Sequence, residues 1–309
     1  MKFNKTPKLG VAYTAGDPPP LWLLEHLELV YEGSAEKPGT VRTEGEYRTI
    51  NSRDWGKLGF ETCAHTWFWF KQRHLAAMAE IHGAPVESLQ LRAPRLGLIL
   101  AHMEYMGKIA PFTPHIVDAI NEPLNPDNAG PLIKPVPGPV DEVEQVTVEE
   151  LGTILTLANE WAPSSMLCIN EWGCETTEKR STRFKQIIDG LITHPLFLKR
   201  KVMVGLQCHL TVGDEAFFED ALYPLLNYLA ISDIPFRFSE VDIEDDGSPT
   251  GQQDTFRALW KAACRFGAED LTFWHWRDLN HWKGDQKAGP CHEDGTPKGW
   301  FKDFLDGCL

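Results

Sequence analysis

The chain has 309 residues, a length that fits one large barrel or two domains of average size. Its apolar fraction of 42% and charged fraction of 24% are those of an ordinary globular protein, and no apolar run is long enough to span a bilayer. The formal net charge of −14 argues against nucleic acid or an anionic membrane as the main partner, because both are bound through clustered Lys and Arg. A neutral main ligand is therefore expected.

The cysteines and tryptophans indicate which kinds of ligand the protein could bind. The seven cysteines are odd in number and show neither a Cys-x-x-Cys pair nor a His-rich spacing, so at least one thiol is free and no metal site or cofactor is expected. Three of them, Cys63, Cys168 and Cys208, lie in apolar runs where cysteine usually acts as a small hydrophobic residue. The 11 tryptophans supply flat faces on which sugar rings stack, although most tryptophans belong to a core.

The start of the chain carries positive charge at Lys2 and Lys5 without an apolar segment after it, so the sequence shows no signal peptide. The expected location is the cytoplasm, or outside the cell if a leader is not included.

Short apolar runs alternate with helix-length amphipathic stretches, which is the pattern of a parallel α/β protein. Predicted strands lie at 8–14, 28–32, 59–66, 116–121, 166–170, 202–209, 235–241 and 270–276. Predicted helices lie at 71–82, 86–107, 148–161, 179–192, 214–230 and 251–266. The second strand is the weakest, because its residues also fit a continuation of a helix that begins at Leu21. Eight strands favour a closed barrel over an open sheet.

Two local patterns refine this organisation. Thr147 followed by Glu150 predicts a capping box at the start of the helix over 148–161. The stretch 123–144 is rich in Pro, Gly and Asp and has no periodicity, so it predicts a long loop after the fourth strand. No repeat or linker divides the chain. The prediction is a single α/β domain over 1–309, a (β/α)8 TIM barrel with a long loop after strand 4.

Three glutamates stand where predicted strands end. Glu122 closes an apolar run in Asn-Glu-Pro, Glu171 closes another in Asn-Glu-Trp, and Glu240 follows Phe-Arg-Phe-Ser. The catalytic groups of barrel enzymes lie at these strand ends. A single glutamate there is more often a solvated or ion-paired residue of the rim, but three together favour a catalytic pair.

Glycoside hydrolysis needs one carboxyl group to protonate the leaving oxygen and a second on the other side of the sugar, about 5–5.5 Å away in retaining enzymes. Strands four and seven of an eight-stranded barrel face each other, so Glu122 and Glu240 can converge on one bond. Glu122 and Glu171, on neighbouring strands, offer a poorer geometry.

The strand ends also resemble those of glycoside hydrolase family 10, the endo-β-1,4-xylanases. The resembling segments occur in the same order along most of the chain, at 64–69, 105–109 with 117–123, 205–210, 238–243, 272–278 and 295–298. Each segment alone is a weak pattern, whereas their shared order is specific. The resemblance implies a TIM barrel and a retaining mechanism.

The same resemblance implies roles for the matching positions. Glu122 would be the acid/base and Glu240 the nucleophile, with Asn121 on the sugar 2-hydroxyl and Asp242 polarising His209. The remaining residues expected to bind or hold the saccharide are His65, Trp69, Gln207, His209, Trp274 and Trp282, with Trp172 on the aglycone side. Glu171 would lie near that side, outside the chemistry, as a carboxylate of the rim.

The chain departs from the family around the glycone pocket. It lacks the Asn-Glu-Met-Lys-Trp segment after the second strand, for which Glu32 and Lys37 are candidate substitutes. Phe70 replaces a His, Val117 a Trp, and His275 a Gly. Such changes alter specificity more readily than mechanism.

The expected function is therefore a retaining hydrolase of internal β-1,4-xylosidic bonds in xylan or its oligosaccharides, acting as a monomer. Two alternatives remain: a retaining barrel glycosidase acting on another β-glycan, and a non-catalytic carbohydrate-binding barrel.

Overall fold

The computed structural model describes residues 6–14, 16–33, 55–69, 72–85, 92–109, 113–124, 147–278 and 286–307. The chain forms two compact units that interleave along the sequence. The first unit comprises Met1–Tyr31, Trp172–Thr182 and Val204–Leu309, and the second comprises Glu32–Glu171 and Arg183–Met203.

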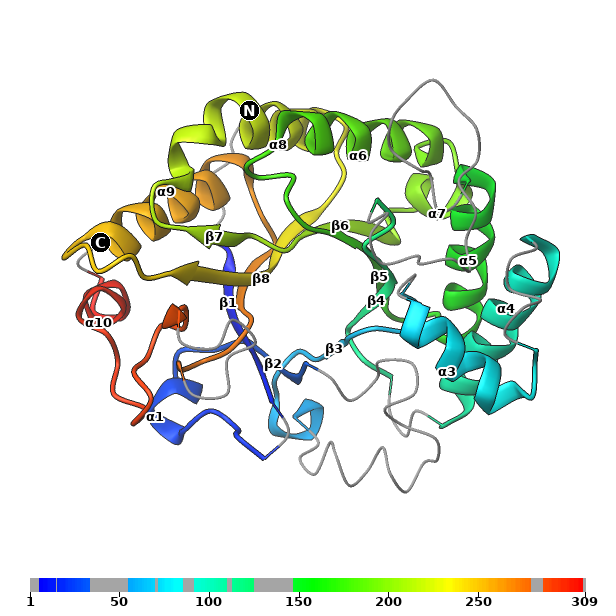
Figure 1. The fold of residues 1–309 in the computed structure, drawn as a ribbon, viewed down its shortest axis with the longest axis horizontal. Coiled ribbons are helices and arrows are strands. Elements are labelled where there is room, and N and C mark those ends of the chain that lie inside the picture. Colours follow the sequence, from blue (N-terminus) through cyan, green and yellow to red (C-terminus); the bar gives the residue numbers. More distant parts are fainter. Residues whose placement is uncertain are drawn as a thin grey trace. The chain divides into compact units, whose positions relative to one another are not determined.

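The first unit is built on parallel strands in the order β2-β1-β9-β8-β6, with the short β7 paired to β8. Their bounds are β1 Lys8–Tyr13, β2 Leu29–Glu32, β6 Val202–Leu206, β7 His209–Thr211, β8 Phe236–Glu244 and β9 Asp270–Phe273. Val11 of β1 lies opposite Phe273 of β9, and these two strands run side by side (Figure 1). The segments that follow β1 and β9 therefore leave the same edge of the sheet.

Helices of the first unit follow its strands in sequence. They are α1 Leu21–Leu24, the 3-10 turn η5 Asp214–Phe217, the π turn η6 Phe218–Leu222, α8 Tyr223–Ile231, α9 Gly251–Phe266 and α10 Gly299–Leu305. Helix α9 packs on β8 and β9 through buried side chains spaced three and four residues apart, among them Phe256, Leu259 and Ala263. It ends at Gly267, whose φ of 81° is the left-handed conformation that favours glycine.

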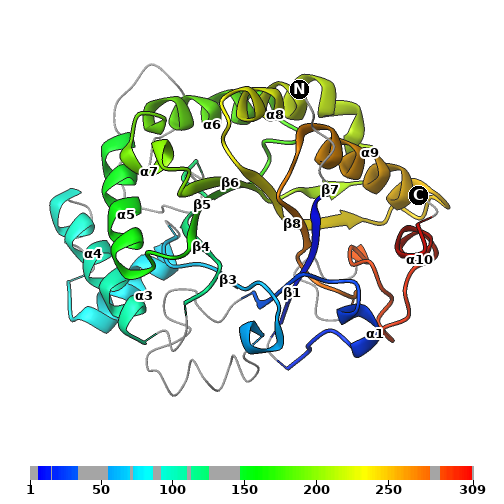
Figure 2. The same ribbon diagram turned by 180° about the vertical axis from the view of Figure 1, so that it is seen from behind.

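The second unit carries parallel strands in the order β5-β4-β3. Its elements are η1 Gly56–Leu58, β3 Cys63–Ala64, α3 Gln72–His82, α4 Arg92–Ile109, β4 Ile116–Asn121, α5 Val148–Trp161, β5 Met166–Glu171 and α7 Pro195–Leu198, and α6 Glu178–Leu191 runs from the first unit into it. Helix α5 lies along β4 and β5, and α4 packs on its other side (Figure 2). Leu151, Ile154, Leu155 and Ala158 form the buried stripe of α5.

The structure contains all eight predicted strands and adds detail to them. The predicted strand 202–209 is divided, because Cys208 has a φ of 58° and separates β6 from β7. The predicted helix 214–230 begins with η5 and η6 in place of a regular α-helix. The predicted capping box is present, since Thr147 Oγ1 accepts a hydrogen bond from Glu150 N and Glu150 Oε2 accepts one from Thr147 N.

Other predictions have mixed outcomes. The three cysteines expected to be buried are buried, and the six cysteines of the described residues carry free thiols. The loop expected after strand 4 falls almost entirely in 125–146, outside the described residues. No helix among the described residues is long and apolar enough to cross a membrane. The single-domain assignment remains a prediction.

Candidate active site

Glu240 and Asp242 lie on β8 of the first unit. They are two residues apart in a strand, so both side chains leave the same face of the sheet. Both are buried, with exposed fractions of 4% and 1%. The register of β8 against β9 shifts between Phe238 and Val241, a bulge-type irregularity directly at the predicted nucleophile.

His209 contacts both carboxylates. As the first residue of β7 it lies opposite Asp242 on β8. Its Nδ1 lies 2.8 Å from Asp242 Oδ2, and its Nε2 lies 3.4 Å from Glu240 Oε2. Burial alone would lower the pKa of His209, but the charges and hydrogen bonds of Asp242 and Glu240 outweigh it and raise the pKa to about 10. The imidazole is therefore a cation at neutral pH, and it favours the ionised form of the carboxylate it faces.

The backbone around Glu240 is fixed by its neighbours in the first unit. Glu240 N donates to Gln207 O at 3.2 Å, and Trp274 N donates to Val241 O at 3.0 Å. Gln207 and Trp274 are both buried, at 2% and 8% exposed. These bonds bring the ends of β6 and β9 next to the nucleophile position on β8.

Glu122 directly follows β4 in the second unit. Its φ of 54° is a conformation that non-glycine residues seldom adopt and that is often found at functional sites. Glu122 N donates to Asn170 O at 2.7 Å, and the Asn170 side-chain amide donates to Asn121 Oδ1 at 2.8 Å. Because all three residues are buried, Asn170 on β5 sets the orientation of both Asn121 and Glu122.

The predicted sugar-binding residue His65 is also oriented by a carboxylate. Its Nδ1 lies 2.8 Å from Asp118 Oδ2, and both side chains are buried. The backbone of Trp69 pairs with that of Asn121 in an isolated parallel β-bridge. The Trp69 ring stacks on the ring of His74, with centroids 4.9 Å apart. The second unit thus groups Glu122, Asn121, His65 and Trp69 at the ends of β3 and β4.

Glu171, the last residue of β5, and Trp172, which follows it, have different environments. Trp172 is 36% exposed, and the Arg180 guanidinium lies over its ring at 4.1 Å. Glu171 was expected at the rim, and that expectation is wrong: it is fully buried and accepts a hydrogen bond from Leu124 N at 2.7 Å. A buried backbone donor after β4 needs this acceptor. Trp282, Lys37 and Phe70 lie outside the described residues, as does the side chain of Glu32.

Three further residues contribute to the site and were not predicted from the sequence. Asp118 and Asn170 orient predicted residues, and each is a polar residue inside an otherwise apolar strand. That contrast is a usable signal, because a buried polar group is more informative than an exposed one. Glu175 was also missed. It is 1% exposed, burial raises its pKa, and its charge interacts with His209.

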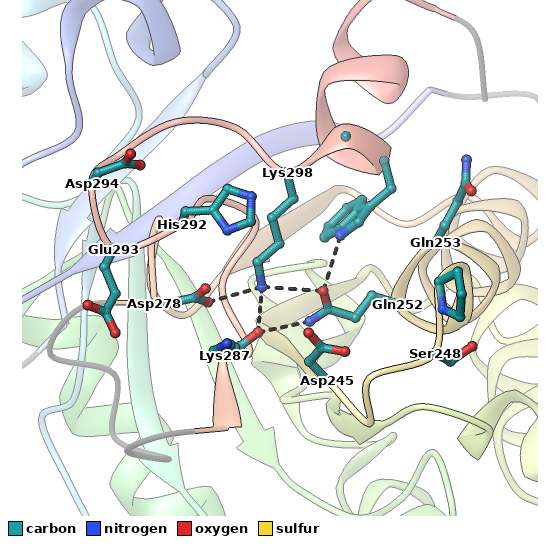
Figure 3. A pocket seen from close by; sticks show the side chains of 13 residues that line it. Asp245, Ser248, Gln252, Gln253, Asp278, Lys287, His292, Glu293, Asp294 and Lys298 are labelled. Atoms are coloured by element: carbon teal, nitrogen blue, oxygen red, sulfur yellow. Dashed lines mark hydrogen bonds and ion pairs between the residues drawn. The ribbon is translucent and has the colours of Figure 1, made fainter.

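A polar cavity of about 530 Å³ lies elsewhere in the first unit (Figure 3). Lys298 is buried in its wall, where its Nζ donates to Asp278 Oδ1 at 3.1 Å, to Gln252 Oε1 at 3.3 Å and to Lys287 O. None of the predicted catalytic or sugar-binding residues lines this cavity. Among the described residues, no group of three His, Cys, Asp or Glu side chains could hold a metal ion.

The model of glycosyl hydrolase family 10 matches residues 59–306. None of the curated proteins matches the sequence. Solved structures do match, and because their sequence identities are low, they show the fold.

Three of the matching structures are xylanases. A psychrophilic family 10 endo-β-1,4-xylanase has a TM-score of 0.74 at 18% identity and covers 97% of each chain. Xylanase 10B from Thermotoga petrophila, in complex with xylobiose, has a TM-score of 0.73 at 16% identity, over 99% of this chain and 95% of that one. A glycosylated endo-β-1,4-xylanase from Gloeophyllum trabeum has a TM-score of 0.73 at 16% identity, over 99% and 98%. The predicted TIM-barrel fold is confirmed.

Proposed function

Because the chain belongs to glycosyl hydrolase family 10, we propose that it hydrolyses internal β-1,4-xylosidic bonds of xylan or xylo-oligosaccharides with retention of configuration. The observation that carries this proposal is the position of His209, whose imidazolium faces Glu240 and is held by Asp242. A nucleophilic carboxylate must be ionised, and this arrangement favours ionisation. The choice of substrate is supported by the matching structures, which include an endo-β-1,4-xylanase and a xylanase in complex with xylobiose.

The proposed mechanism is a double displacement. In the first step the Glu240 carboxylate attacks the anomeric carbon while Glu122 gives its proton to the leaving oxygen, and a glycosyl ester forms on Glu240. In the second step Glu122 removes a proton from water, the water attacks the same carbon, and Glu240 is released as a carboxylate. Asn121, oriented by Asn170, is the donor for the 2-hydroxyl, where hydrogen bonds strengthen in the transition state.

The substrate assignment is tested by assaying the protein on a panel of polysaccharides. We expect new reducing ends from xylan, and the loss of that activity in Glu240→Gln. Glu160→Gln is the matched control, because Glu160 is an exposed glutamate on α5 with the same change in charge. If xylan is inert while another β-glycan is cleaved, the substrate assignment fails and the retaining glycosidase remains.

A second β-glycan is a real candidate for a specific reason. The sequence lacks the Asn and Lys that follow the second strand in the family, and it carries His275 where the family has Gly. A non-catalytic carbohydrate-binding barrel is the third candidate. The carbohydrate-binding barrel is the correct assignment if the protein binds xylan and any hydrolysis that is measured is unchanged in Glu240→Gln.

A further inference from the structure

The segment after β9 is fastened to the segment after β1. Trp276 Nε1 donates to Asp17 O at 2.9 Å, and Arg277 Nε donates to Asp17 Oδ2 at 2.9 Å while a second guanidinium nitrogen bonds the other oxygen. The Arg277 guanidinium also lies over the Trp276 ring, 4.7 Å from its centroid. A paired two-bond contact of this kind fixes orientation as well as distance. The residues that precede Trp276 are therefore held in place.

His275 lies inside this fastened segment. Its Nδ1 is 3.3 Å from Thr14 Oγ1, and its ring meets the Trp274 ring edge-on, at an interplanar angle of 76° with centroids 6.0 Å apart. Thr14 belongs to the segment after β1, so the same two chain segments that Asp17 joins also direct the imidazole. Because Nδ1 faces the threonine, Nε2 points away from it.

The position of His275 relative to the chemistry follows from the backbone. Trp274 N is bonded to Val241 O, and Val241 is the residue next to Glu240. The imidazole of His275 thus packs against an indole that is attached directly to the nucleophile strand. It is partly exposed, whereas Trp274 is 8% exposed.

The indole of Trp274 with the imidazole of His275 beside it combines an apolar face with a hydrogen-bonding group. A pyranose has an apolar face that packs on indole and a rim of hydroxyl groups that need hydrogen-bond partners. From this arrangement we infer that His275 is a sugar-binding residue, whose Nε2 hydrogen-bonds a hydroxyl group of the xylose unit that packs against Trp274. This inference rests on the proposed function and adds a specificity residue to it.

A hydrogen bond from His275 to the sugar would make the site selective for particular sugars. A site that hydrogen-bonds a hydroxyl group discriminates against a sugar that lacks it, because that hydrogen bond is then lost. His275 therefore selects a hydroxyl pattern on the unit bound at Trp274. Thr14 acts as a positioning residue, because its hydroxyl group directs the ring.

The test measures binding of xylobiose by calorimetry in a Glu240→Gln background, where the ligand is not consumed. We expect His275→Ala to weaken binding about tenfold, as for the loss of one hydrogen bond to a neutral partner. His275→Gln, whose amide reaches the Nε2 position, is expected to restore most of the affinity. His275→Asn, whose amide reaches only the Nδ1 position, is not. His292→Ala, which removes an exposed histidine of the same unit, is the control and is expected to bind normally.

A set of monodeoxy xylobiosides completes the test. One of them is expected to bind about tenfold more weakly than xylobiose to the Glu240→Gln protein, and equally weakly with or without His275→Ala. Equal affinity for xylobiose in His275→Ala and its parent overturns the role of His275 and leaves the proposed function intact. Rescue by Asn as fully as by Gln also overturns it, since that points to a packing role toward Thr14. If the parent protein binds no xylobiose and the unsubstituted enzyme cleaves no xylan, the proposed function fails and this inference fails with it.

Discussion

The Nε2 atom of His209 lies 3.4 Å from Oε2 of Glu240, while Nδ1 of the same ring is held 2.8 Å from Asp242. One imidazolium therefore joins the predicted nucleophile to a second, more deeply buried carboxylate. The raised pKa of His209, about 10, results from these two partners against the opposing effect of burial. The charge of Asp242 therefore acts on Glu240 through the imidazolium of His209.

Asp242→Asn is expected to lower the alkaline limit of activity. With the Asp242 charge removed, the pKa of His209 falls from about 10, so the proton that faces Glu240 is lost at lower pH. We expect kcat/KM to fall roughly 10- to 100-fold at pH 8 and less at pH 6, by analogy with carboxylates that orient metal-binding histidines. The measurement is a pH profile of kcat/KM. Asp246→Asn, an exposed change on the same segment of chain, should leave the profile unaltered. An alkaline limb that does not move in Asp242→Asn would contradict the role of the pair.

Glu122→Gln is expected to separate the two chemical steps. Without an acid, departure of a sugar alcohol is slowed severely, by about 100- to 10,000-fold on xylan, which is the usual contribution of a general acid. A dinitrophenyl xylobioside needs little protonation, so its initial burst of dinitrophenol should persist. Rapid-quench measurement of the burst and steady-state assay on xylan report the two steps. Loss of the burst together with xylan activity would show that Glu122 is not the acid.

The buried His102 of α4 predicts how folding stability depends on pH in the acid range. Burial, together with the charges of His82 and His74, lowers the pKa of His102 to about 3. The unfolded chain takes up a proton at this residue below about pH 6.5, whereas the folded chain does so only near pH 3. Folding stability therefore declines as the pH falls from 6.5 toward 3, by about 1.4 kcal/mol per pH unit from this group.

Urea unfolding at pH 7 and pH 5 measures that dependence. The stability lost between these two values is expected to be about 2 kcal/mol smaller in His102→Leu than in the unsubstituted protein. His26→Leu, at an exposed histidine, should leave the loss unchanged. An identical pH dependence in His102→Leu would mean that His102 is not held neutral.

Lys298→Met is expected to destabilise the first unit. Lys298 and Asp278 are 5% and 6% exposed, so removing the lysine leaves a carboxylate buried without its cation (Figure 3). The expected cost is about 3–5 kcal/mol in chemical denaturation. Lys302→Met removes the cation of an exposed pair with Asp306 and should cost less than about 1 kcal/mol. A Lys298→Met protein as stable as Lys302→Met would show that the buried pair does not stabilise the fold.

Much of the fold was predictable because its strands are continuous apolar runs and its helices carry periodic apolar stripes. Glu122, directly after β4, and Glu171, the last residue of β5, were located at strand ends in this way, whereas Glu240 lies inside β8, which continues to Glu244. The break at Cys208 was not predictable, because a positive φ in a non-glycine residue has no signature in the local pattern.

Partnerships within the site were harder to predict. His65 and Asp118 are 53 residues apart, and they meet only because β3 and β4 pair in the register that sets Ala64 opposite Val117. The same holds for Asn121 and Asn170 across β4 and β5. Such contacts depend on register between strands, which the sequence of either strand leaves open. The burial of Glu171 was misjudged for the same reason, since its partner is a backbone donor after another strand.

Trapping of the glycosyl-enzyme intermediate tests the central claim most directly. A 2-deoxy-2-fluoro xylobioside with a dinitrophenol leaving group slows both steps, because the fluorine destabilises the positively charged transition state, while the activated leaving group still allows the first step. Intact-mass and peptide mass spectrometry then locate the ester. We predict one fluoroxylobiosyl group per chain, attached to Glu240. An ester on another residue, or turnover of natural substrate to the inverted anomer with no ester formed, would contradict the account.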